Sequence, residues 1–218
     1  MSALSPDPEP AAAVARRLRD AGPLALDDGE ALQLIGALRP GEAEALLAEF
    51  GSLPEVLAAG AAQLERLVSP NRAARLGLAR DLVRRVLVTP LRARPLMPGL
   101  TVVADYLRAV LGGLPREQFR VLFLDKRNRL IRDEVMGEGA VDHAPVYPRE
   151  VLRRALELGA SALVLAHNHP GGDPAPSQAD IDATRQVVEA GRALGVSVHD
   201  HVLVAGETVA SFRAMGLL

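Results

Sequence analysis

Several residue types are scarce or missing in this 218-residue chain. It contains no cysteine and no tryptophan, and aromatic residues make up only 3% of it. The absence of cysteine excludes disulfides, thiolate-bound metals and cysteine nucleophiles. It also argues against the zinc deaminases, whose metal is held by cysteines. Any metal must therefore be bound by histidine, carboxylate and water, and the core must be built from leucine, valine and alanine.

Long apolar runs are also missing. The chain has no stretch of about 18 consecutive apolar residues that could span a membrane. Residues 1–12 are rich in proline, alanine and acid, and they lack the basic start and apolar core of a secretory signal. We therefore expect a cytoplasmic protein with no membrane partner and with a disordered tail over residues 1–12.

Charge is nearly balanced overall but not along the chain. The formal net charge of −2 predicts no general attraction to nucleic acid or to an anionic membrane. However, eight arginines and one acid, Asp81, lie between Arg66 and Arg94, whereas Lys126 is the only lysine of the chain. Arginine suits bidentate contacts with phosphate, although a bias in genomic base composition explains the same preference equally well.

The first part of the chain has the periodicity of short helices. Residues 13–88 predict a compact helical domain, with helices over 13–21, 28–37, 42–50, 54–59, 61–67 and 72–87. Three prolines follow between residues 89 and 99, and proline removes a backbone donor and disfavours helix before it. We therefore expect a linker over 89–99 and a second domain over 100–218.

The second domain alternates between strands and helices. Apolar runs predict strands over 119–124, 130–135, 161–166 and 196–204, with helices over 104–111, 148–158 and 178–194. The first two strands form a hairpin around a turn at 125–128. This alternation predicts an α/β sandwich with a mixed sheet.

The most informative motif follows the apolar strand 161–166. It reads His-Asn-His-Pro from His167 to Pro170, then Ser177 and, three residues later, Asp180. Two histidines at i and i+2 of an extended backbone point to one side. Asp180, near the start of a helix that Ser177 caps, can add a carboxylate. Histidine and carboxylate ligands with an open position for water are typical of a catalytic zinc site.

A structural interpretation competes with this one. The two histidines alone fit a polar turn after a strand, and Asp180 alone fits an acid that interacts with the helix dipole. Ligand sites of α/β sheets gather at the carboxyl ends of strands, where both histidines are expected. The complete set at this spacing therefore favours a metal site that activates water for hydrolysis.

The same residues resemble a known enzyme family. The spacing His-x-His, seven residues, Ser, two residues, Asp is the motif of the JAMM (MPN-type) zinc metalloproteases. The strings Tyr147-Pro-Arg-Glu150, Ala166-His-Asn-His-Pro170, Gly172-Asp-Pro-Ala-Pro-Ser177 and Asp200-His201 resemble the RadC branch of that family. The resemblance covers the chain from about residue 100 to its end and implies an α-β-α sandwich of the MPN/JAB type. The helical part weakly resembles the helix-hairpin-helix module that precedes this domain in RadC-like proteins.

The resemblance also implies a site and a chemistry. His167, His169 and Asp180 would bind zinc with water as the fourth ligand, and Ser177 would donate a hydrogen bond to the tetrahedral intermediate or hold the water. A separate glutamate would act as general base. In this family it opens an early apolar strand, which favours Glu117. Its competitors are three further glutamates, Glu134, Glu138 and Glu150.

The predicted function is therefore that of a zinc-dependent metallopeptidase or isopeptidase acting on an unidentified peptide or protein. Gly171 stands where RadC-like sequences usually have serine, but this departure touches no ligand. Asp200 lies between His199 and His201 in an apolar strand. These residues could support a zinc ligand through a hydrogen bond, or they could form a hydrogen bond that serves only the fold. The sequence leaves both roles open.

The alternative is an accessory protein linked to DNA repair, in which the helical domain binds DNA and the second domain is a scaffold. A helix-hairpin-helix holds phosphate through a Gly-x-Gly turn. This chain reads Leu67-Val-Ser-Pro-Asn-Arg72 at that point, so both glycines are missing and Pro70 removes a donor. A salt-dependent DNA titration separates the two functions. The sequence indicates neither the substrate nor the oligomeric state.

Overall fold

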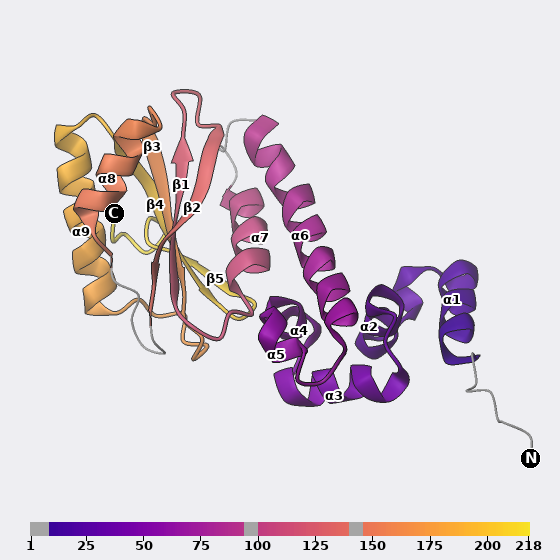
Figure 1. Cartoon of the computed structure of the whole chain (residues 1–218). Helices are drawn as coiled ribbons and strands as arrows, with labels where there is room; N and C mark the ends of the chain where they lie inside the picture. Colours follow the sequence, from indigo (N-terminus) through magenta and orange to yellow (C-terminus); the bar gives the residue numbers. More distant parts are fainter. Residues whose placement is uncertain (1–8, 94–99, 140–145) are drawn as a thin grey trace, which may run out of the picture. The chain divides into compact units, whose positions relative to one another are not determined.

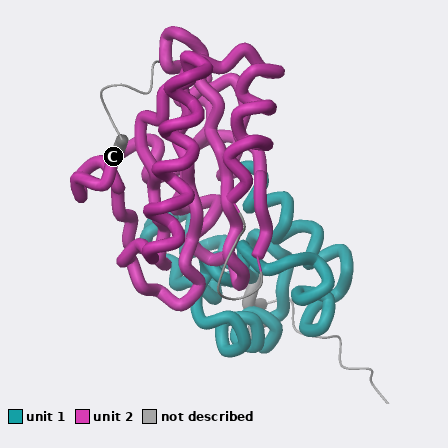
Figure 2. Tube along the Cα trace, turned by 90° about the vertical axis from the view of Figure 1, so that its left-hand side faces the viewer, with its two compact units in different colours: residues 1–82 teal, residues 83–218 magenta. Residues whose placement is uncertain are grey.

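The chain forms two compact units, described by a computed structural model for residues 9–93, 100–139 and 146–218. The units comprise residues 1–82 and 83–218 (Figure 2). Helix α6, Pro70–Ala93, begins in the first unit and ends in the second. Of the linker expected over 89–99, residues 89–93 are the last part of α6, and residues 94–99 lie outside the described part of the chain.

Short capped helices build the first unit. They are α1 (Glu9–Ala21), the 3₁₀ helix η1 (Pro23–Ala25), α2 (Asp28–Gly36), α3 (Pro40–Phe50), α4 (Leu53–Ala58), α5 (Ala61–Leu64) and the first part of α6. The start of α2 is set locally, because Asp27 accepts the Glu30 N–H at 2.8 Å and Glu30 accepts the Asp27 N–H at 3.1 Å. Helices α2 to α6 share one buried apolar cluster, which includes Leu32, Leu46, Leu64 and Leu76.

Helices α1 and α6 are both longer than the sequence predicts. α1 begins at Glu9, so residues 9–12, expected in the disordered tail, are helical. α6 continues past residue 87 to Ala93 although Pro90 lies inside it. Leu91 is fully buried in the core of the second unit, where Leu87 and Val88 pack beside it. Burial of such side chains contributes about 1.5–3 kcal/mol each and offsets the hydrogen bond that the proline removes.

A five-stranded mixed sheet forms the centre of the second unit, with the strand order β2-β1-β3-β4-β5. The antiparallel hairpin joins β1 (Gln118–Leu124) to β2 (Leu130–Glu138). Strand β3 (Ala162–Asn168) is antiparallel to β1 and parallel to β4 (Ser197–Ala205). The short strand β5 (Thr208–Ser211) pairs with β4 and was not predicted from the sequence, because it has only four residues.

Helices cover both faces of this sheet (Figure 1). Helix α7 (Leu100–Leu111) packs on one face, against even-numbered strand residues such as Leu122 and Val164. Helices α8 (Pro148–Glu157) and α9 (Gln178–Ala193) pack on the other, against odd-numbered residues such as Val121 and Leu165. This alternation is the period of two of a β-strand. The α-β-α sandwich with a mixed sheet, preceded by an all-helical part, is thereby confirmed.

Candidate metal centre

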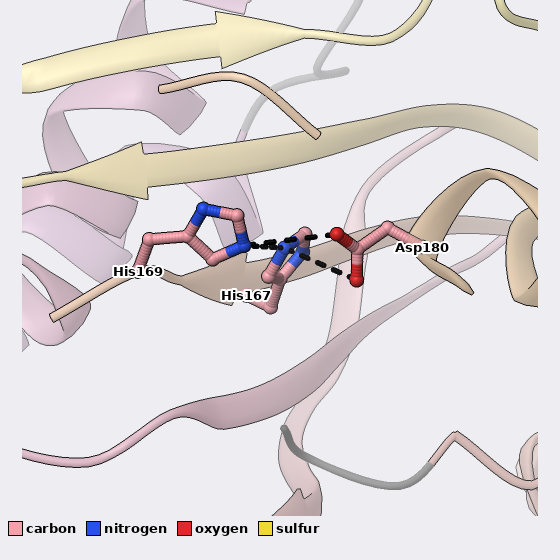
Figure 3. Close-up of side chains that lie close together, drawn as sticks. All are labelled: His167, His169 and Asp180. Carbon is pink, nitrogen blue, oxygen red and sulfur yellow. Dashed lines mark hydrogen bonds and ion pairs between the residues drawn. The ribbon is translucent and has the colours of Figure 1, made fainter. Parts of the chain in front are cut away.

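The three predicted metal ligands come together where β3 ends and α9 begins (Figure 3). His167 is the penultimate residue of β3, His169 follows the strand directly, and Asp180 lies in the first turn of α9. Side chains two residues apart in extended backbone lie on one face, and in β3 that is the face covered by α8 and α9. The chain therefore brings both imidazoles to the helix that carries the carboxylate.

The ligand atoms of the three side chains all lie within 4.8 Å of one another. The Nε2 atoms of His167 and His169 are 3.1 Å apart. Asp180 places Oδ1 3.5 Å from His167 Nε2 and Oδ2 3.6 Å from His169 Nε2. Ligands at 2.0–2.1 Å in a tetrahedron around zinc are about 3.3–3.4 Å apart. Each histidine nitrogen lies near this distance from its nearer Asp180 oxygen, so the three side chains could hold one metal ion.

The capping of α9 holds the Asp180 carboxylate in place. Its Oδ2 accepts the Ser177 N–H at 2.8 Å and the Ser177 hydroxyl at 2.6 Å, while Ser177 Oγ accepts the Asp180 N–H at 3.2 Å. Burial raises the pKa of Asp180, but the hydrogen bond and charge of His167, together with the Ser177 donors, outweigh burial and hold that pKa well below its usual range. The helix cap and the metal site therefore use the same ionised carboxylate.

Ser177 reaches the site through Asp180. Its single hydroxyl hydrogen is donated to the Asp180 carboxylate, which can only accept. In this arrangement Ser177 orients a ligand. Its role toward a tetrahedral intermediate stays a prediction.

The loop after β3 orients His169. The backbone carbonyl of Asp173 lies 2.8 Å from His169 Nδ1. A carbonyl only accepts, so Nδ1 carries the proton and Nε2 has a free lone pair. That lone pair is on the ring edge next to His167 and Asp180, where a metal ligand is needed.

Glu117 is the glutamate nearest to these ligands among the described candidates. It directly precedes β1, its side chain is only 11% exposed, and its Oε1 is 3.7 Å from His169 Nε2. The cross-strand pair of Phe119 and His167 explains this position, because Glu117 lies two residues before Phe119. The β1–β3 pairing thus brings a carboxylate to the edge of the metal site.

The competing glutamates are held elsewhere. Glu134 accepts two hydrogen bonds from Arg154, at 2.8 and 2.6 Å, and these lower its pKa. The Glu138 carboxylate accepts a hydrogen bond from the Gln118 side chain. Glu150 accepts one from Arg153. Each of these three carboxylates is therefore engaged in a surface or inter-element contact.

Asn168 was missed as a functional candidate by the sequence analysis. It is 2% exposed, and its Oδ1 accepts the Gln118 N–H at 2.9 Å. Its Nδ2 donates to the carbonyls of Arg116 at 3.1 Å and Leu114 at 3.4 Å. Two of these partners flank Glu117, so the residue between the two histidines holds the segment that presents the glutamate. The only hint in the sequence was its place within the motif.

The Asp200-His201 pair divides its roles between the two faces of β4. Asp200 accepts hydrogen bonds from the Ser211 hydroxyl at 2.5 Å and from the Arg213 N–H at 3.0 Å, which fasten the chain after β5. The other face of β4 carries His201, whose Nε2 lies 2.8 Å from His167 Nδ1. Asp200 is therefore structural, whereas His201 contacts a predicted metal ligand directly.

Two of the eight clustered arginines serve the fold of the first unit. Arg72 donates to the Ala37 carbonyl at 3.0 Å and to the Glu42 carboxylate at 2.8 Å. Arg80 donates to the Ala58 carbonyl at 3.2 Å. Part of the arginine density is thus explained by helix packing, and DNA binding by this unit stays a prediction.

A comparison with protein families identifies the family of the second unit. The family model described as RadC-like JAB domain matches residues 99–217. The chain belongs to the RadC-like JAB domain family. The match spans the whole sheet and all the residues of the metal centre, and it confirms the resemblance that the His-x-His motif indicated. Separately, none of the helices in the described residues is long and apolar enough to cross a bilayer.

Proposed function

We propose that the second unit is a zinc-dependent hydrolase that cleaves an amide bond of a peptide or isopeptide. The observation that carries this proposal is the group of His167, His169 and Asp180, whose ligand atoms lie within 4.8 Å of one another, bordered by the Glu117 carboxylate. Membership of the RadC-like JAB family supports it.

The ligand chemistry favours zinc. Two imidazole nitrogens and one carboxylate oxygen form a mixed N/O set, which suits zinc better than the all-oxygen sets of magnesium or calcium. Three protein ligands leave a tetrahedral site with one open position. A zinc ion held there would lower the pKa of a coordinated water and polarise a substrate carbonyl.

Glu117 supplies the proton transfer in this proposal. Its carboxylate lies 3.7 Å from His169 Nε2 and is free of any arginine or lysine contact in the described residues. It would accept a proton from the attacking water and return it to the leaving amine as the amide bond breaks. Asn168, which holds the backbone on both sides of Glu117, would keep the carboxylate at this distance.

Metal content tests the ligand assignment. Elemental analysis of the full chain is expected to find one zinc per wild-type molecule and none in the His167→Ala/His169→Ala variant. His199→Ala is the matched control, because His199 contacts Asn128 outside the ligand group and its loss is expected to leave zinc unchanged. Stoichiometric zinc in the double variant would refute the assignment.

Hydrolysis tests the activity. The probe is a fluorogenic library of peptides and lysine-linked isopeptides, presented to the zinc-loaded chain. Glu117→Gln is expected to lower the rate by about 100-fold to 10,000-fold, the usual contribution of a general base. Glu134→Gln is expected to leave the rate unchanged because Glu134 contacts Arg154. A zinc-loaded wild type that cleaves nothing in the library would favour the scaffold alternative.

A further inference from the structure

A chain of three buried hydrogen bonds runs from α9 to a predicted metal ligand. It connects the Asp180 carbonyl to Thr184, Thr184 to His201, and His201 to His167. We propose that Thr184 and His201 are positioning residues that keep a proton on Nδ1 of His167, so that Nε2 is the nitrogen that binds the metal. This inference rests on the proposed metal site.

Thr184 determines in which direction the hydrogen bonds of this series are donated. The residue is 1% exposed, and its Oγ1 lies 2.5 Å from the backbone carbonyl of Asp180. A carbonyl has no hydrogen to give, so the hydroxyl hydrogen of Thr184 points toward it. Toward His201 Nδ1, at 2.6 Å, the hydroxyl oxygen can therefore only accept. His201 must carry a proton on Nδ1.

His201 then determines the direction of the next hydrogen bond, the one to His167. Its ring is 2% exposed and packs against the Phe119 and Phe212 rings, an apolar surrounding that disfavours the charged imidazolium. A neutral ring with its proton on Nδ1 has a lone pair on Nε2. His167 Nδ1, 2.8 Å away, must then donate its proton to that lone pair. Nε2 is therefore the nitrogen of His167 that is available to a metal, and it faces His169 and Asp180.

The two histidine ligands are thus held by different means. His169 is oriented by a backbone carbonyl, which has one possible role. The partner of His167 is another imidazole, which can either donate or accept, so a third group has to decide between the two. That group is Thr184, one turn after Asp180 on the same helix. This series of hydrogen bonds, the Thr184–His201 relay, therefore makes the tautomer of His167 depend on α9, the helix that supplies Asp180.

Without the Thr184 hydroxyl, no group determines which nitrogen of His201 carries the proton. His201 can then carry its proton on Nε2 and donate to His167 Nδ1, which places the His167 proton on Nε2. A protonated nitrogen cannot bind a metal, so zinc would have to reverse both tautomers on binding. Loss of such a supporting contact typically lowers metal affinity by about 10-fold to 100-fold.

The test compares Thr184→Val, which keeps the shape and lacks the hydroxyl, with Thr184→Ser, which keeps the hydroxyl. Zinc affinity of the full chain is measured by competition with a chelator. The valine variant is expected to bind zinc about 10-fold to 100-fold more weakly, and the serine variant is expected to restore wild-type affinity. Equal affinity of wild type and the valine variant would overturn the proposal, as would equally weak binding by the valine and serine variants.

A second measurement reads the tautomers without metal. Two-bond ¹⁵N–¹H correlation spectra of the zinc-free chain are expected to show the proton on Nδ1 for both His167 and His201. In Thr184→Val this pattern is expected to be lost, because either ring can then donate. A wild-type His201 protonated on Nε2 would refute the relay. A wild type with the expected tautomers that binds no zinc would refute the proposed function and leave the relay standing.

Discussion

Asn168 offers the sharpest test of how the site is held together. In Asn168→Ala, the Gln118 N–H loses its acceptor at 2.9 Å and the Arg116 carbonyl loses its donor at 3.1 Å, in a place where Asn168 is 2% exposed. Each short neutral hydrogen bond contributes about 1 kcal/mol, and a buried N–H left unpaired costs about 1–3 kcal/mol. The expected loss in the free energy of unfolding is therefore about 2–3 kcal/mol.

Tyrosine fluorescence in urea is the assay, because the chain has two tyrosines and no tryptophan and both tyrosines lie in the second unit. The unfolding midpoint is expected to fall while the slope of free energy against urea stays constant. A variant within about 0.5 kcal/mol of wild type, the range of ordinary surface substitutions, would refute the argument.

Asn168→Asp is the matched variant. It keeps an acceptor for the Gln118 N–H but turns a carboxylate oxygen toward the carbonyls of Arg116 and Leu114. Burial and these carbonyls should raise the pKa of the new carboxyl group. A raised pKa favours the protonated folded state, so the variant should recover stability relative to wild type as pH falls. A penalty that is independent of pH would contradict this.

Asn168→Ala should also affect catalysis more than metal binding. Its hydrogen bonds hold the residues on both sides of Glu117, and His167 and His169 face the other side of β3. A displacement of the carboxylate by about 1 Å can cost about 100-fold in rate. We therefore expect zinc content close to that of wild type with a much lower rate of hydrolysis. Loss of both in proportion would indicate a general disruption of the site.

Three further predictions follow from buried or paired charges. Tyr106→Phe removes the phenol that donates to Asp133 and should cost about 1–2 kcal/mol by circular dichroism in urea. Since burial, followed by the charge of Asp133, raises the pKa of Tyr106, wild-type stability should fall as pH rises above 10.0, and the phenylalanine variant should lack this fall. Arg154 lowers the pKa of Glu134, so the cost of Glu134→Gln, about 0.5–1 kcal/mol at neutral pH, should shrink as pH falls below 4.5. Asp180→Asn should weaken zinc binding by more than about 100-fold in chelator competition, because a charged ligand is lost.

Local patterns in the sequence were enough to predict the main elements of the second unit and the three residues of the candidate metal site. The apolar run before His167 predicted β3, and Ser177 predicted the start of α9, since a capping side chain acts on its own helix turn. Where local signals misled, tertiary packing decided. Pro90 indicated the end of a helix, but burial of Leu91 carries α6 to Ala93.

The sequence by itself determined which atoms can bind a metal, because His167, His169 and Asp180 lie within fourteen residues of chain and their geometry follows from one strand, one loop and one capped helix. Only the tertiary structure decided what surrounds them. Glu117, which directly precedes β1, lies beside His169, and His201 of β4 lies beside His167. Both contacts depend on strand pairing, whose register no local pattern specifies. The candidate ligands can therefore be predicted from the sequence, whereas the positions of Glu117 and His201 depend on which strands the sheet places side by side.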